Sequence, residues 1–168
     1  MKNIVKISLL LIGLSFLTVG CFDDLEIPKA ESLAMSGEWW TTNTVDGIDA
    51  FGTGYQLIRS FNTAANGVDT MWITDDAHHY WFKAKTPIDL AAKTFVGDSL
   101  PSSIVVDGFG LYEVDMTITN GQILDDAGTT RTGSVADSIY MELEFSDDPG
   151  TIYVVSGHRR SGFDADEF

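Results

Sequence analysis

The sequence is poor in cysteine, in basic side chains and in helical periodicity, and each shortage argues against a class of protein. Cys21 is the single cysteine of the 168 residues, so the chain forms no internal disulfide. The 10 Lys and Arg residues face 25 Asp and Glu residues, and the formal net charge of −15 disfavours nucleic acid as a partner. No long segment carries an apolar stripe of period 3.6, which argues against helical bundles.

The start of the chain has the pattern of a bacterial lipoprotein signal. A basic beginning with Lys2 and Lys6 is followed by the apolar stretch 7–19 and by a small residue before Cys21. The apolar stretch has roughly 13 residues, too few to span a bilayer as a helix, which needs about 20. The pattern therefore predicts cleavage before Cys21 and acylation of Cys21, a stable membrane anchor. The alternative is an ordinary secretory signal with a leftover thiol, since Thr18 stands where lipoprotein signals usually have leucine.

Segment 22–26, Phe-Asp-Asp-Leu-Glu, places three carboxylates directly after Cys21. It resembles the acidic export signal of Bacteroidetes surface lipoproteins, so it predicts an outer-membrane lipoprotein exposed on the cell surface. The alternative is a solvated tether on a lipoprotein that faces the periplasm. Cleavage would lower the count of basic residues from 10 to 8 and leave 25 acidic ones, a net charge of −17. Such a charge disfavours contact with anionic lipid except through the anchor.

Composition and turn signals divide the chain into four parts. Residues 1–20 are the predicted signal peptide, and residues 21–35, with few periodic features, are an acidic tether. Residues 36–163 have the length of one domain with a core, and residues 164–168 are an acidic tail.

Beyond the tether the pattern is that of β-strands joined by short turns. Residues 139–145 and 114–119 alternate apolar with polar or amphipathic side chains, the two-residue period of a strand with one covered face. The pair Asn120-Gly121 between apolar runs predicts a hairpin. The predicted strands are 37–45, 54–61, 68–74, 79–88, 93–96, 103–106, 114–119, 122–124, 139–145 and 151–160. About eight to ten strands joined by hairpins predict an all-β, up-and-down antiparallel barrel of about eight strands, because closure removes exposed edges.

Trp39 and two arginines predict how the barrel closes. In lipocalin-like barrels, a Gly-x-Trp at the start of the first strand lies beneath an arginine of the last strand. This sequence has Gly37-Glu38-Trp39 at one end of the domain and Arg159-Arg160 at the other. The resemblance implies that Arg159 or Arg160 covers the Trp39 indole in a cation–π contact. The alternative is a core tryptophan with solvated arginines.

A second resemblance covers about residues 36–163. The segments that carry it are 62–66, 92–95, 132–140, 144–151 and 155–163. They resemble the lipid-binding putative hydrolases, small Bacteroidetes lipoproteins with a calycin-like barrel. The resemblance implies a lipid or another small hydrophobic ligand. The hydrolase label brings no motif that can be transferred to positions of this chain.

Apolar strand faces supply candidates for binding such a ligand. Tyr80 and Phe82 share one face of a predicted strand, and Tyr112 and Met116 share a face of another. Met141 lies on a third, and methionines among aromatics suit an adaptable pocket. A barrel of about eight strands has an interior that is either filled or wide enough for one small ligand. The alternative is that these residues are the packed core.

Catalytic candidates are few. Ser156 and His158 lie two apart on a predicted strand, so they share a face, with Cα atoms about 6.6 Å apart. No Gly-x-Ser-x-Gly elbow surrounds Ser156, so a polar strand end is favoured over a catalytic pair.

Metal candidates are also few. Segment 75–79, Asp-Asp-Ala-His-His, gathers possible ligands, but adjacent histidines on a strand point to opposite faces, so at most one could join His158. Two acidic pairs, Asp46 with Asp49 and Asp147 with Asp148, lack the full ligand loop of a calcium site. Neither a metal nor a cofactor is expected.

Three functional hypotheses follow. The first is a lipid-anchored barrel that binds a small apolar, lipid-like ligand without covalent chemistry. The second is a hydrolase of lipids or esters. The third is an accessory protein of a surface nutrient-uptake complex, in which Trp40, Trp72 or Trp81 stacks on a glycan or a partner protein.

Overall fold

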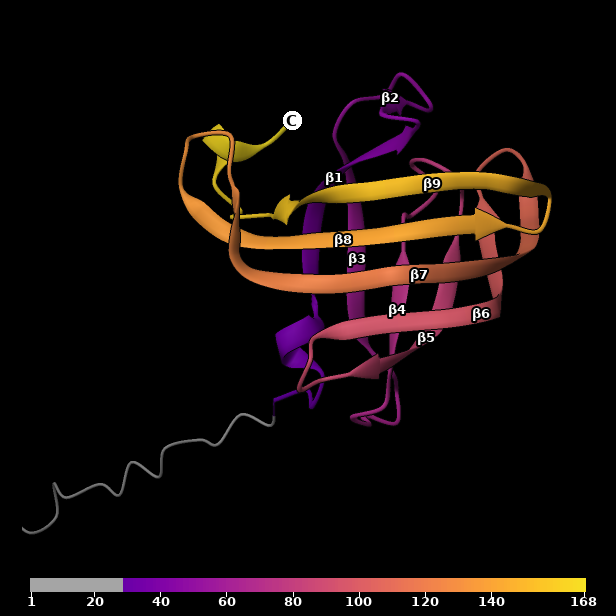
Figure 1. The fold of residues 1–168 in the computed structure, drawn as a ribbon, viewed down its shortest axis with the longest axis horizontal. Helices are drawn as coiled ribbons and strands as arrows, with labels where there is room; N and C mark the ends of the chain where they lie inside the picture. Colours follow the sequence, from indigo (N-terminus) through magenta and orange to yellow (C-terminus); the bar gives the residue numbers. More distant parts are fainter. Residues whose placement is uncertain (1–28) are drawn as a thin grey trace, which may run out of the picture.

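The computed structural model describes residues 29–168, which form a closed antiparallel β-barrel (Figure 1). The predicted signal peptide, the predicted anchor Cys21 and the acidic segment 22–26 lie outside the described residues. Eight strands follow one another in sequence order, and the last pairs with the first from Trp39↔Arg159 to Thr44↔Val154. One further short strand extends the first strand as a hairpin. The predicted up-and-down barrel is confirmed.

The strands are β1 (Gly37–Val45), β2 (Ile48–Asp49), β3 (Gln56–Asn62), β4 (Thr70–Thr74), β5 (Lys83–Asp89), β6 (Thr94–Val106), β7 (Gly110–Thr129), β8 (Val135–Phe145) and β9 (Asp148–Arg159). Two 3₁₀ turns, η2 (Leu33–Met35) and η3 (Asp164–Asp166), flank the barrel. Within residues 29–168 no helix has the length and hydropathy that crossing a bilayer requires.

Inward-facing side chains fill the barrel. On β8, Ile139, Met141, Leu143 and Phe145 alternate with half-buried residues and are completely buried. This is the two-residue period that the sequence predicts. Inward residues of the other strands join them in one continuous core cluster.

Two predicted breaks between strands are wrong, because the predicted strands 93–96 and 103–106 are parts of the long strand β6, and 114–119 and 122–124 are parts of β7. Asn120-Gly121 does not form a hairpin but lies inside β7, where the pairing with β8 shifts between Thr119 and Gln122. Asn120 has a φ of 52°, and a Cβ on Gly121 would lie 2.1 Å from the carbonyl oxygen of Phe95. The pair therefore forms an irregularity that bends β7. Residues that tolerate positive φ serve in such bulges as well as in hairpin turns.

The predicted strand 79–88 begins too early. Residues 75–82 form a loop, and β5 starts at Lys83. Tyr80 and Phe82 therefore do not share a strand face, and the conformation of this loop is decided by Asp75, as described below.

Candidate functional site

One end of the barrel is closed around Trp39. The Arg159 guanidinium lies 4.4 Å from the centre of the Trp39 ring and donates to the carbonyl oxygen of Ser36. The indole N–H donates to Ser60 Oγ at 2.9 Å. Arg160 instead pairs with Glu38 and Glu167 and lies outside the barrel end. Of the two predicted arginines, it is Arg159 that the structure places over Trp39.

Three of the five predicted ligand-binding residues lie deep in the core. Met116 and Met141 have no exposed surface, and Phe82 is 1% exposed. They pack against other core side chains and do not line the outer groove described below. The barrel interior around them is filled by side chains.

The other two predicted residues, Tyr80 and Tyr112, meet at the opposite end of the barrel. Their hydroxyl groups donate to the two oxygens of Asp147, at 2.8 and 2.5 Å. The Tyr80 ring is stacked on Phe145 with ring centres 3.6 Å apart, and Tyr153 lies edge-on to both. This end is therefore covered by aromatic rings held by carboxylates.

Burial and neighbouring carboxylates keep these tyrosines protonated. Burial raises the pKa of Tyr153 to about 12, and its hydrogen bond to Asp148 acts in the same direction. The pKa values of Tyr80 and Tyr112 are raised as well, first by burial and then by Asp147. Neutral phenols are hydrogen-bond donors and poor nucleophiles, so the cluster has the chemistry of a cover rather than of a catalytic centre.

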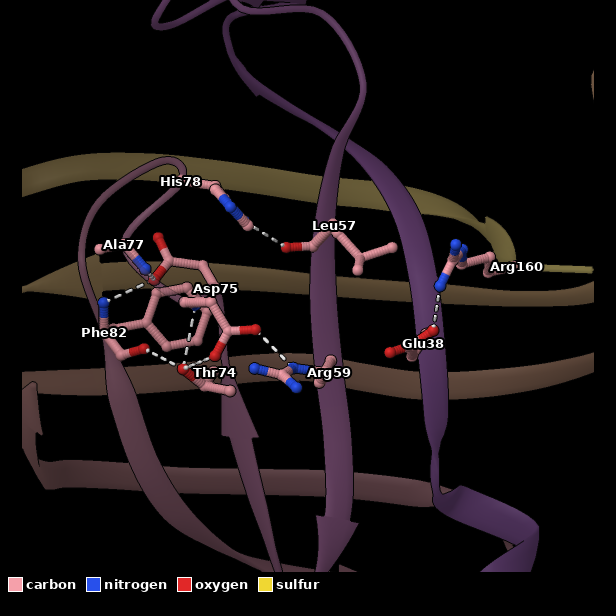
Figure 2. Close-up of polar contacts among 10 residues, drawn as sticks. Glu38, Leu57, Arg59, Thr74, Asp75, Ala77, His78, Phe82 and Arg160 are labelled. Atoms are coloured by element: carbon pink, nitrogen blue, oxygen red, sulfur yellow. Dashed lines mark hydrogen bonds and ion pairs between the residues drawn. The ribbon is translucent and has the colours of Figure 1, made fainter. Parts of the chain in front are cut away.

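The loop of residues 75–82 is built around the Asp75 carboxylate. Its Oδ1 accepts the backbone N–H groups of Ala77 and Phe82, and its Oδ2 accepts those of His79, Tyr80 and Trp81, all at 2.8 to 3.1 Å. Asp75 is completely buried, and Figure 2 shows it between Ala77 and Phe82 at the top of β4 and β5. The same bonds hold Trp81 at a φ of 68°, a strained value for a bulky side chain.

This arrangement leaves the predicted metal ligands apart. Both oxygens of Asp75 are engaged by backbone N–H groups, and Asp76 pairs with Arg59 at 2.5 Å. His78 Nδ1 lies 3.1 Å from the carbonyl oxygen of Leu57 on the outer face, whereas His79 is buried. Among residues 29–168 no three His, Cys, Asp or Glu side chains gather as metal ligands.

Ser156 and His158 share the outer face of β9, as predicted. The Phe168 and Tyr55 rings lie 5.9 and 5.8 Å from the imidazole and cover it. Burial lowers the pKa of His158, and its Nε2 has no hydrogen-bond partner in the described residues. No hydrogen bond in that part of the chain joins it to Ser156. The pair is not arranged as a nucleophile and its base.

A hollow of about 410 Å³ lies on the outer face of β1, β3, β4 and β5. Figure 2 shows Arg59 between Thr74 on one side and the Glu38–Arg160 pair on the other. The lining residues are Gly37, Glu38, Arg59, Ser60, Phe61, Thr74, Asp76 and Lys83. We call this hollow the outer groove.

Lys83 gives the outer groove an unpaired positive charge. Its ammonium group lies 5.9 Å from the centre of the Phe61 ring and 5.5 Å from that of Trp72. Both acids of the groove are neutralised, since Asp76 pairs with Arg59 and Glu38 with Arg160. Lys83 forms no ion pair with any described residue. The groove thus joins an aromatic wall to a free cation in a strongly acidic chain.

The family described as lipid-binding putative hydrolase matches residues 24–164, most of the chain. The chain belongs to this family. No protein among the curated ones matches it.

Membership of the lipid-binding putative hydrolase family and a β-barrel both fit a lipid-binding role. Sequence reasoning missed the groove residues Phe61 and Lys83, although it named Trp72 as a candidate for stacking. The sequence contained part of the necessary pattern, because Arg59 and Phe61 alternate with residues that are buried on β3. What was lacking was the strand register, Phe61↔Trp72 between β3 and β4 and Thr74↔Lys83 between β4 and β5, which brings these residues together.

Proposed function

We propose that this protein is an outer-membrane lipoprotein, anchored through Cys21 and exposed at the cell surface, that binds anionic amphiphiles without covalent chemistry. The observation that carries the binding role is Lys83, a cation of the outer groove that has no ion-pair partner within residues 29–168 and lies beside the rings of Phe61, which lines the groove, and Trp72. Family membership supports a lipid ligand, and the sequence pattern before Cys21 supports the anchor.

The chemistry of the groove selects the head of the ligand. A carboxylate or phosphate accepts hydrogen bonds from the Lys83 ammonium, and a charge-assisted hydrogen bond is worth about 1.5–3 kcal/mol. Arg59 and Asp76 form an ion pair in the same groove and offset each other, so the uncompensated positive charge of the groove comes from Lys83. In a chain with 25 acidic residues such a place is uncommon, so an anion has few competing sites.

The apolar part of the ligand can pack on the rings of Phe61 and Trp72. Phe61 and Trp72 face outward from β3 and β4 and are only partly buried. An acyl chain that covers them removes apolar surface from water, worth about 25 cal/mol per Å². The filled interior favours this outer site over the barrel lumen.

Titration with a fluorescent fatty acid, cis-parinaric acid, tests the groove. We expect Lys83→Gln to weaken binding by about tenfold, because one charge-assisted hydrogen bond is lost. Lys93→Gln is the matched control, since Lys93 pairs with Asp125 and does not line the groove. The methyl ester of the same acid should bind wild type and Lys83→Gln alike. Equal affinity of both proteins for the free acid would refute the assignment.

Fractionation of cells tests the anchor. Cys21→Ser should move the protein from the membrane fraction to the soluble fraction, because stable anchoring needs the acyl chains on that thiol. Replacing the three acids of segment 22–26 by their amides should keep the protein in the membrane but protect it from protease added outside the cells. Membrane retention of Cys21→Ser would contradict the anchor, and unchanged protease sensitivity of the amide variant would contradict the surface signal.

A further inference from the structure

Asn43 is a buried amide with no partner. Its side chain is completely buried, and neither Oδ1 nor Nδ2 makes a hydrogen bond within residues 29–168. Thr41, two residues earlier on the same inward face of β1, is completely buried too. A buried amide without hydrogen bonds is costly, so nearly all buried polar groups in proteins have partners. Asn43 therefore requires an explanation.

The amide lies where the wall of the barrel is incomplete. Pairing between β1 and β3 ends at Thr41↔Gln56, whereas pairing between β1 and β9 continues to Thr44↔Val154. On the β3 side, residues 42–45 have only the β2 hairpin and the segment that follows it. Beside Asn43 the wall is thus completed by the β2 hairpin alone, which pairs with β1 at Thr44↔Asp49 and Val45↔Ile48 in place of β3; we call this part of the wall the seam.

A glycine-rich flap, residues 46–55, covers the seam. The N–H of Ala50 donates to the carbonyl oxygen of Asn43, and the Asp49 carboxylate accepts backbone N–H groups from Phe51, Gly52 and Gly54. Gly52 and Gly54 both have a φ of 65°, and a Cβ on either would meet open space. The flap is held to the barrel by few bonds and has glycines on both sides of Thr53.

Phe51 and His79 form the underside of this cover. The Phe51 ring is stacked on Tyr153, with centres 5.9 Å apart, and lies 5.8 Å from the ring of His79. His79 Nδ1 lies 3.4 Å from the hydroxyl of Thr53, and within residues 29–168 the buried His79 Nε2 has no hydrogen bond of normal geometry, although the imidazole interacts with the Thr41 backbone. Burial lowers the pKa of His79, so the imidazole is neutral at pH 7. In the neutral ring, one nitrogen is a hydrogen-bond donor and the other is an acceptor.

We propose that the seam beneath the flap is a second binding site, which takes the uncharged polar head of a small amphiphile such as a monoacylglycerol. Asn43 offers both a donor and an acceptor to hydroxyl or ester groups of the head, and His79 Nε2 offers one more polar contact. The rings of Phe51 and Tyr153 receive the apolar part. A charged head is disfavoured because Asn43 and neutral His79 supply no opposite charge.

This site is separate from the outer groove in place and in chemistry. The groove offers the Lys83 cation to an anion on the outer face, whereas the seam offers neutral hydrogen-bonding atoms on the inner face of β1. The two sites can therefore be tested with ligands that differ only in the charge of the head.

Calorimetric titration with 1-monooctanoylglycerol, paired with thermal unfolding, tests the seam. Asn43→Leu has nearly the same shape but no polar atoms, so we expect it to lower affinity at least tenfold and yet to raise the unfolding midpoint of the free protein. The rise follows because an unpartnered buried amide is destabilising. Thr42→Val, on the outer face of the same strand, should change neither quantity. In the wild type, the Asn43 side-chain amide resonances should shift as the ligand is added.

Several outcomes would overturn the proposal. They are a wild type that does not bind 1-monooctanoylglycerol, unchanged affinity in Asn43→Leu, or a lower unfolding midpoint in that variant, which would make Asn43 a structural residue. The same ligands test the outer groove independently of the seam. Lys83→Gln should bind 1-monooctanoylglycerol as the wild type does, and Asn43→Leu should bind cis-parinaric acid as the wild type does.

Discussion

Replacing Asp75 by asparagine should lower the free energy of unfolding by about 2–6 kcal/mol. The Asp75 carboxylate accepts five backbone N–H groups, two at Oδ1 and three at Oδ2. An amide keeps only one of these oxygens, so at least two buried N–H groups lose their acceptor and face an NH₂ group instead. Each unsatisfied buried donor costs about 1–3 kcal/mol.

The neighbouring residue provides a matched control for Asp75→Asn. Asp76 is paired with Arg59 on the partly exposed outer face, and exposed ion pairs are worth about 0–1 kcal/mol. Urea denaturation of Asp75→Asn, Asp76→Asn and the wild type separates the two roles. Equal effects of the two changes would show that the loop does not depend on the buried carboxylate.

The loss of these hydrogen bonds in Asp75→Asn should also loosen the packing at the end of the barrel. The loop that Asp75 organises carries His79 beneath the flap and Tyr80 on Phe145. Protease sensitivity near residues 75–82 should rise in Asp75→Asn before global unfolding, because the hydrogen bonds that hold the strained Trp81 are lost.

Gly157→Ala should prevent the barrel from closing, with a loss of about 4 kcal/mol or more. A Cβ at this position would lie 1.9 Å from the carbonyl oxygen of Trp40 and 2.7 Å from the Cα of Thr41. Both are backbone atoms of β1, so no side-chain rotation relieves the contact. Strands β1 and β9 must separate, and their pairing is what closes the barrel.

Ser156→Ala is the control for Gly157→Ala, since it makes a small change one residue earlier on the outer face of the same strand. We expect its free energy of unfolding to differ from that of the wild type by no more than ordinary surface substitutions cause, about 0.5 kcal/mol. Circular dichroism and urea denaturation report both variants. A Gly157→Ala protein as stable as Ser156→Ala would show that β1 and β9 tolerate a wider spacing.

Local patterns predicted much of the barrel. Alternation on β8 placed Ile139, Met141, Leu143 and Phe145 on one face, and all four are buried. The Gly-x-Trp pattern at one end of the domain and the arginine pair at the other predicted that Arg159 or Arg160 covers Trp39, and in the structure Arg159 does so. These features depend on residues close in sequence or on a pairing that any closed barrel of this kind must make.

Other features were predicted wrongly because their causes lie outside the short segments themselves. Asn120-Gly121 has the composition of a hairpin, yet Phe95 on a neighbouring strand occupies the space beside Gly121 and the pair bends β7 instead. Residues 79–82 have the composition of a strand, but a carboxylate several residues earlier collects their N–H groups. Intrinsic preferences of short segments give way to contacts with distant partners.

The sequence by itself determined the strand-rich fold class, the acidic surface and the pattern that predicts an anchor at Cys21, because each depends on composition or on a short period. Only the tertiary structure decided which residues meet. It filled the barrel interior with Met116 and Met141 and, within the described residues 29–168, left Lys83 without an ion pair beside Phe61 and the buried Asn43 amide without a hydrogen bond. These outcomes depend on strand register, which is fixed by packing across the barrel and not by any one segment.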